Sequence, residues 1–120
     1  MIRTVNAEEL TEKISEMCVE ANHFLSGDMK NVMKRAAEKE KSPLGRQILE
    51  QLQENLKIAS EDMIPICQDT GMAVVFLEIG QDVHLEGAAL EDAVNEGVRR
   101  GYRDGFLRKS VVGDPLIREN

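Results

Sequence analysis

The chain has 120 residues, of which 42% are hydrophobic and 31% charged, and a formal net charge of −7. This length suits one small globular domain, whereas the acidic balance excludes general nucleic-acid binding, which needs a basic surface. No apolar run reaches the roughly 18 residues of a membrane span, and the start of the chain lacks the apolar stretch of a signal peptide, so we predict a cytoplasmic protein with no nucleic-acid or membrane partner.

The first predicted element is a helix whose apolar residues run from Leu10 to Leu25. Asn6 and Glu9 form its capping box, and residues 1–5 lead directly into it. The apolar residues of this helix recur at spacings of three and four, which places them on one face. Cys18 belongs to that face, so we expect it to lie in the core.

Two more amphipathic helices are predicted in the first half of the chain. Gly27 ends the first helix, and Asp28 can cap a second one, whose apolar face lies within residues 29–36. Ser42 as N-cap and Pro43 at the first helical position mark the start of a third helix. The chain is therefore predicted to begin with about three helices.

The segment PICQDTG, residues 65–71, places a thiol, an amide and a carboxylate at consecutive positions of a predicted turn. Pro65 fixes one backbone angle and Gly71 permits a positive φ, so the turn can hold its side chains rigidly. The apolar run that follows, residues 72–79, predicts a buried strand. From these residues alone, Cys67 can be either a buried thiol in a well-formed turn or a ligand at the end of a strand.

The second half changes its periodicity. Residues 82–86 alternate polar and apolar side chains as a short, half-exposed strand does, which turns His84 toward solvent or toward a neighbouring surface. A fourth helix is predicted over about residues 89–104. Three glycines follow one another there at a spacing of four, namely Gly97, Gly101 and Gly105. Because an interior glycine costs about 1 kcal/mol relative to Ala, we expect another element or another subunit to pack closely against this edge.

The last predicted element is an extended segment over residues 106–112. Together the elements predict an α+β fold: a helical region over residues 1–64, then a strand–helix–strand region over residues 65–120 that carries the CQDTG motif. A sheet with so few strands has open edges that need cover. We therefore expect one structural unit that is an incomplete part of a larger domain, truncated at its C-terminus.

One window reverses the acidic balance of the chain. From Arg99 to Lys109, five basic residues stand against one acidic residue, which gives a local charge of +4. A positive window of this kind can attract an anion.

Two runs, PICQDTGMAVVFLEIGQDVHLEG and NEGVRRGYRDGFLRKSVVGDPL, resemble the amino-terminal region of the iron–sulfur-dependent class I fumarate hydratases and of the L-tartrate dehydratase alpha subunits. The resemblance extends through the whole chain, and its specific parts are the CQDTG motif and the LRKS segment. It implies that Cys67 is one of three thiolates holding a 4Fe–4S cluster whose fourth iron is open to substrate. It also implies that Gln68 and Arg108 bind the substrate carboxylates. Asp69 would transfer a proton or orient the group that does, although Asp69 also suits an ordinary turn.

By this resemblance, the complete protein is a hydro-lyase that reversibly hydrates fumarate to malate, or dehydrates tartrate, with the cluster as Lewis acid. The implied partners are the remainder of the alpha subunit, a beta subunit or domain, a dicarboxylate substrate, and further copies in a homo-oligomer. The choice among fumarate, tartrate and methylated fumarates stays open.

The chain itself has two cysteines that form no local pair, which excludes a self-contained structural zinc site. With Cys67 as its single suitable thiolate, we expect the 120-residue chain alone neither to hold a 4Fe–4S cluster nor to hydrate fumarate. The alternative function is a non-catalytic module that binds a partner or senses oxidation through Cys67.

Overall fold

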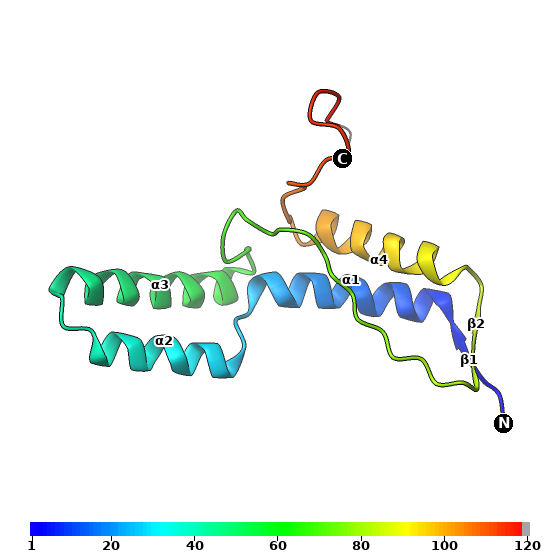
Figure 1. Ribbon diagram of the computed structural model, residues 1–120, viewed down its shortest axis with the longest axis horizontal. Coiled ribbons are helices and arrows are strands. Elements are labelled where there is room, and N and C mark those ends of the chain that lie inside the picture. Colours follow the sequence, from blue (N-terminus) through cyan, green and yellow to red (C-terminus); the bar gives the residue numbers. More distant parts are fainter. Residues whose placement is uncertain (119–120) are drawn as a thin grey trace. The chain divides into compact units, whose positions relative to one another are not determined.

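The computed structural model describes residues 1–118, which form four helices and two short strands (Figure 1). In chain order these are β1 (Arg3–Asn6), α1 (Ala7–His23), α2 (Gly27–Lys39), α3 (Pro43–Asp62), β2 (Val83–Glu86) and α4 (Leu90–Asp104). The predicted α+β class is confirmed. Three helices, α1 to α3, precede β2, which belongs to a small two-stranded sheet, and the packed helix α4 follows. None of the helices in this part of the chain is long and apolar enough to cross a membrane.

The chain folds as two compact units. One unit combines residues 1–20 with the chain from residue 68 onward, and the other comprises residues 21–67. The compact units are defined by which residues pack together in the structure. The expected division into residues 1–64 and 65–120 stays a prediction. Each unit is described by itself below.

The first unit is built on close contact between α1 and α4, which run alongside each other in Figure 1. A Cβ atom added at Gly97 would lie 2.7 Å from the carbonyl oxygen of Thr11, and one at Gly101 would lie 2.7 Å from the Cβ of Cys18. The Thr11 hydroxyl donates a buried hydrogen bond of 3.0 Å to the carbonyl of Ala93. The close approach predicted from the glycines is therefore confirmed, and the element that makes it is α1 of the same chain.

Cys18 lies within this contact and is half-buried. Its predicted place on the packed face of α1 is therefore correct. Burial raises the pKa of its thiol because removing water disfavours the thiolate. Cys18 is accordingly a packing residue of the α1–α4 contact.

The strands β1 and β2 form a two-stranded parallel sheet with Arg3 opposite Val83 and Asn6 opposite Glu86. The expectation that residues 1–5 lead directly into a helix was wrong, because Arg3, Thr4 and Val5, together with Asn6, pair with a strand about 80 positions away. The prediction of β2 is confirmed: its side chains alternate between half-buried and exposed. His84 is exposed, as expected.

Two other predicted strands, over residues 72–79 and 106–112, are not strands in the described part of the chain. Both segments are irregular there, because strand assignment needs a ladder of backbone hydrogen bonds and residues 1–118 offer them none. The pattern of apolar residues shows that a segment is suited to a sheet. It does not show whether a second strand is present to pair with that segment.

The expected positive window on α4 is largely neutralised by ion pairs. Glu96 accepts hydrogen bonds from Arg99 at 2.6 Å and from Arg100 at 2.7 Å, and Arg100 also pairs with Glu8 near the start of α1. These guanidinium groups lower the pKa of Glu96 to about 2. Arg103 pairs with Asp104. Three arginines of the window thus face carboxylates and are not a bare anion site.

The second unit contains the end of α1 and the neighbouring helices α2 and α3 (Figure 1). The α3 start is as predicted: Pro43 opens the helix, and the Ser42 hydroxyl accepts a hydrogen bond from the Gly45 amide at 3.3 Å. The cap expected at Asp28 was wrong, because α2 already begins at Gly27 and Ser26 occupies its N-cap position. The core of this unit is small, since α2 buries no residue and α3 buries only one.

Candidate functional site

The CQDTG turn is attached through Ile66 to the second unit. The amide of Ile66 donates to the carbonyl of Asn22 near the end of α1, at 2.9 Å. Its carbonyl accepts a hydrogen bond of 2.8 Å from the side-chain amide of Asn55 on α3. Both backbone groups of Ile66 are therefore occupied, which fixes the chain immediately before Cys67.

In the first unit, Thr70 connects the same turn to the segment that carries Arg108. The buried Thr70 hydroxyl donates to the backbone carbonyl of Arg108 at 2.7 Å. The carbonyl of Thr70 in turn accepts from the Tyr102 hydroxyl on α4 at 3.0 Å. Gly71 follows with a φ of +60°, a left-handed conformation that favours glycine. The positive φ predicted at this position is confirmed.

The C-terminus of α4 explains how Arg108 reaches this turn. The amide of Leu107 donates to the carbonyl of Tyr102 at 2.9 Å, and the amide of Phe106 approaches the carbonyl of Arg103 at 3.4 Å. These bonds form a Schellman motif, with Phe106 in the left-handed position at a φ of 54°. The motif ends the helix abruptly and buries Leu107. Arg108 is the next residue, beside Thr70.

The four residues expected at the site are all exposed. Cys67 is the last residue of the second unit, whereas Gln68, Asp69 and Arg108 belong to the first. Within the first unit, the Thr70 hydrogen bond places the backbone of Arg108 next to the turn. The guanidinium of Arg108 has no hydrogen-bond or ion-pair partner within residues 1–118. It is therefore open to an anionic ligand.

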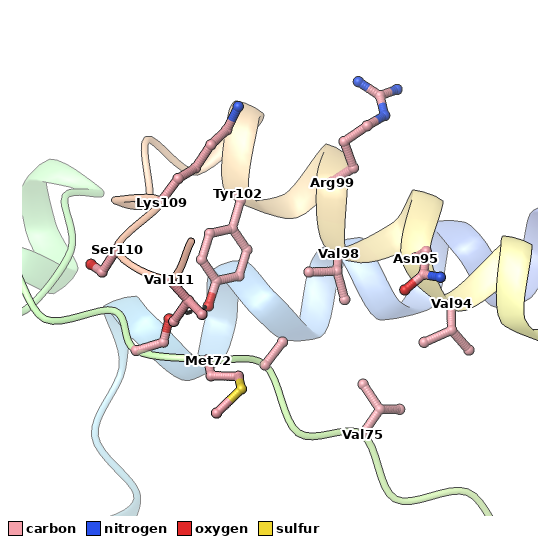
Figure 2. Close-up of a pocket in the computed structure, with 12 residues that line it drawn as sticks. Met72, Val75, Val94, Asn95, Val98, Arg99, Tyr102, Lys109, Ser110 and Val111 are labelled. Atoms are coloured by element: carbon pink, nitrogen blue, oxygen red, sulfur yellow. Dashed lines mark hydrogen bonds between the residues drawn. The ribbon is translucent and has the colours of Figure 1, made fainter. Parts of the chain in front are cut away.

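A cavity of about 600 Å³ adjoins the turn in the first unit (Figure 2). The segment after Gly71 and the face of α4 form its walls, and Val75, Val94 and Val98 line it. Figure 2 shows the Tyr102 ring reaching from α4 to the chain near Met72. None of the four expected site residues lines this cavity. Its lining also includes the polar side chains of Asn95, Tyr102, Lys109 and Ser110.

The residues of this chain do not fit a 4Fe–4S cluster. Such clusters are held mainly by cysteine thiolates, commonly four, and the chain has two cysteines, one of which is packed between α1 and α4. No group of three or more Cys, His, Asp or Glu side chains in residues 1–118 could hold a metal ion. Cys67 is a free cysteine with an exposed side chain. The alternative of a buried thiol in the turn was therefore wrong.

Comparison with known proteins decides the family. The model of the family described as fumarate hydratase (Fumerase) matches residues 11–120. The chain belongs to the fumarate hydratase family. The resemblance inferred from the CQDTG and LRKS segments is thereby confirmed.

Three relatives illustrate the range of this family. A putative L(+)-tartrate dehydratase subunit alpha of Methanocaldococcus jannaschii is 37% identical and matches 93% of the chain. A putative class I fumarate hydratase of Geobacillus stearothermophilus is 28% identical over 94% of it, and fumarate hydratase 2 of Leishmania major is 33% identical over 88%. The chain spans 39%, 22% and 19% of the lengths of these relatives.

Sequence reasoning missed three residues that hold the turn in this fumarate hydratase family member. The backbone carbonyl of Asn22 accepts a hydrogen bond from the Ile66 amide, and the side chain of Asn55 donates one to the Ile66 carbonyl. The Tyr102 hydroxyl donates to the carbonyl of Thr70. In a helical sequence, asparagine indicates a polar position and tyrosine an amphipathic one. Neither residue type indicates that its side chain or backbone binds a distant part of the chain. Only the fold brings these residues to residues 66–70.

Proposed function

We propose that this chain is part of a hydro-lyase that adds water to fumarate to form malate, or removes it from tartrate. The observation that carries the proposal is the hydrogen bond from Thr70 to the carbonyl of Arg108. It joins the CQDTG turn to the LRKS segment, the two parts of the sequence on which family membership was first inferred. Family membership supports the reaction class, and this hydrogen bond supports a shared site for the two segments within one unit.

In this proposal, Arg108 and Gln68 bind the carboxylates of the substrate. A guanidinium presents parallel N–H groups that match the two oxygens of a carboxylate, and the Gln68 amide can donate to another carboxylate oxygen. Hydration of fumarate builds negative charge on the carboxylate next to the carbon that becomes a carbanion. A cation at that carboxylate therefore stabilises the transition state more than the ground state.

Asp69 has the proposed role of transferring a proton or orienting the group that does. An exposed carboxylate beside a carboxylate-binding amide is suited to proton exchange with the carbon next to a carboxylate. We assign Cys67 as one thiolate ligand of a 4Fe–4S cluster in the complete enzyme, where the cluster would supply Lewis acidity. The remaining thiolates would come from outside this chain.

The proposed partners follow from the same assignment. They are the remainder of an alpha subunit, a beta subunit or domain, and further copies in a homo-oligomer. The match to a tartrate dehydratase subunit alpha supports a partner subunit, since alpha subunits assemble with others. A cytoplasmic location is also part of the proposal, because an exposed thiol such as that of Cys67 stays reduced in a reducing compartment.

Dicarboxylate binding by the chain tests the proposal without requiring a cluster. We would titrate the 15N-labelled chain with fumarate, L-malate and L-tartrate and follow the side-chain signals of Gln68 and Arg108. We expect saturable shifts with a Kd of about 1–10 mM. Because Arg108→Gln removes the charged fork, it should weaken binding about tenfold or more. The matched control is Arg3→Gln, an exposed arginine on β1, which should leave the Kd unchanged.

The proposal is wrong if the shifts are absent at about 50 mM ligand, far above that Kd. It is also wrong if both arginine variants weaken binding equally, because the effect would then reflect net charge. Either result would favour the alternative of a module that senses oxidation through Cys67.

A further inference from the structure

Three hydrogen bonds within the first unit form a closed cycle, which we call the Thr70–Tyr102 cycle. The Tyr102 hydroxyl donates to the carbonyl of Thr70 at 3.0 Å, and the Thr70 hydroxyl donates to the carbonyl of Arg108 at 2.7 Å. The amide of Leu107, the residue before Arg108, returns to the carbonyl of Tyr102 at 2.9 Å. The CQDTG turn, the end of α4 and the LRKS segment are therefore held to one another.

The backbone at Arg108 is fixed on both sides. On one side, Leu107 is buried. On the other, the amide of Ser110 donates to the Arg108 carbonyl at 3.0 Å, which makes a three-residue turn. Together with the Thr70 hydroxyl, this bond uses both lone pairs of the Arg108 carbonyl oxygen. The Arg108 side chain is exposed and has no such partner in residues 1–118. Arg108 thus combines a fixed backbone with an available guanidinium.

The turn is fixed in the same way two positions after Gln68. Thr70 is buried, whereas Gln68 is exposed. The Tyr102 hydroxyl also lies 3.5 Å from the carbonyl of Gly71. Burial raises the pKa of the Tyr102 phenol, so at neutral pH the hydroxyl keeps the proton that it donates. Both hydroxyls of the cycle bind backbone carbonyls, which leaves the side chains of Gln68 and Arg108 available for a ligand.

We propose that Thr70 and Tyr102 are positioning residues, whose hydroxyls set the separation between Arg108 and Gln68 and thereby select a trans dicarboxylate over its cis isomer. The inference rests on the proposed function, which assigns the substrate carboxylates to Arg108 and Gln68. The double bond of fumarate holds its carboxylates on opposite sides, whereas maleate holds them on the same side. Binding groups at a fixed separation can match only one of the two, and groups that are already ordered lose less entropy on binding.

A second buried threonine separates positioning from simple stabilisation. The Thr11 hydroxyl donates a buried hydrogen bond of 3.0 Å to the carbonyl of Ala93, in the same unit and without contact to the turn. Thr11→Val and Thr70→Val therefore remove the same kind of bond and keep nearly the same side-chain shape. Loss of such a bond destabilises the fold at either position, but only Thr70→Val breaks the Thr70–Tyr102 cycle.

The first measurement needs no ligand. We would compare 15N relaxation of the full 120-residue wild-type chain with that of Thr70→Val, Tyr102→Phe, Thr70→Ser and Thr11→Val. We expect order parameters of about 0.85 for the amides of Gln68 and Arg108 in the wild-type chain, falling to about 0.6 in Thr70→Val and Tyr102→Phe. Thr70→Ser keeps the hydroxyl and should restore the wild-type values. Thr11→Val should leave them unchanged.

The second measurement is the ratio of the maleate Kd to the fumarate Kd, obtained by titrating each of these chains. We expect a ratio of at least about five for wild type, Thr70→Ser and Thr11→Val, and a ratio near one for Thr70→Val and Tyr102→Phe. A general loss of folded chain weakens both ligands by the same factor and keeps the ratio constant. The ratio therefore reports positioning and not stability.

The outcomes distinguish this inference from the proposed function. Unchanged order parameters in Thr70→Val and Tyr102→Phe would overturn the positioning role, even if the wild-type chain binds fumarate. A ratio that Thr11→Val lowers as much as Thr70→Val does would reduce the cycle to a structural contact. If the wild-type chain binds neither ligand while both cycle variants lose order, the proposed function and the selection of a trans isomer are wrong, and the positioning of Arg108 is supported.

Discussion

Gly101 shows how one residue decides the packing of this chain. A Cβ atom there would lie 2.7 Å from the Cβ of Cys18 and 2.8 Å from the carbonyl oxygen of Ser15. Backbone atoms of α1 cannot move aside without moving the helix. The missing side chain therefore permits the α1–α4 contact, although glycine lowers intrinsic helix stability.

We predict that Gly101→Ala lowers the free energy of unfolding by about 1–3 kcal/mol, because overpacking outweighs the gain in helix propensity. Urea unfolding followed by circular dichroism would measure the change. Gly27→Ala is the matched control: Gly27 begins α2 and has no atom within 4 Å of its added Cβ. That control should leave stability unchanged or raise it by up to about 1 kcal/mol. A stabilising Gly101→Ala would contradict the close contact.

At the same scale, the sequence located the exposed residues of the candidate site but not what holds them. Cys67, Gln68 and Asp69 were identified by motif, and Arg108 by its place in the LRKS segment. The role of Tyr102 was not predictable, because its hydroxyl binds the carbonyl of Thr70, 32 positions away. Every residue has a backbone carbonyl, so the type of residue does not show whether its carbonyl accepts such a hydrogen bond.

Among the elements, α1 and α4 are joined by charge as well as by packing. Glu96 on α4 is held by Arg99 and Arg100, and Arg100 also pairs with Glu8 on α1. A lone exposed pair contributes little, whereas this network joins two helices whose glycines already bring them close. It also converts the basic window of the sequence into a largely neutral helix face.

This network predicts a pH dependence of stability. The pKa of Glu96 falls from its usual 4.5 to about 2 in the folded chain. Its contribution to stability is therefore present above about pH 4.5 and is lost as the pH falls toward 2. Glu96→Gln should lower the thermal midpoint at pH 7, and the difference from wild type should shrink steadily below about pH 4.5. A difference that stays constant down to about pH 2.5 would show that Glu96 is unpaired in solution.

The predictions of elements succeeded or failed for a consistent reason. Helices α3 and α4 were predicted because caps, proline and periodicity are local signals. The strand predicted over residues 72–79 was wrong because a strand is defined by its neighbour, and residues 1–118 provide none. Conversely, β1 was missed because its four residues carry little pattern and pair only across the chain with β2.

For the whole molecule, the two compact units differ in how much they bury. The first unit buries the hydrophobic residues Ala7, Ile14, Ala93 and Leu107, whereas the second unit buries one hydrophobic residue, Ala59, and the polar His23 among the described residues. Local stability follows buried apolar contact. The second unit should therefore open more readily than the first.

Hydrogen exchange measured by mass spectrometry checks this difference. We expect amides in the central turns of α2 to exchange at least about tenfold faster than those of α4, because opening α2 exposes little apolar surface. Peptides that cover residues 7–20 of α1 provide an internal reference in the first unit. Equal protection of α2 and α4 would mean that the exposed apolar face of α2 and α3 is covered in solution.

The sequence by itself determined the helices and the family and predicted the residues of the candidate site, because caps, periodicity and short motifs are encoded within a few neighbouring positions. Only the tertiary structure decided what the glycines of α4 pack against, which arginines are paired, and that Thr70 joins the CQDTG turn to Arg108. Each of these depends on residues far apart in the chain. Their proximity follows from the fold, and no local pattern records it.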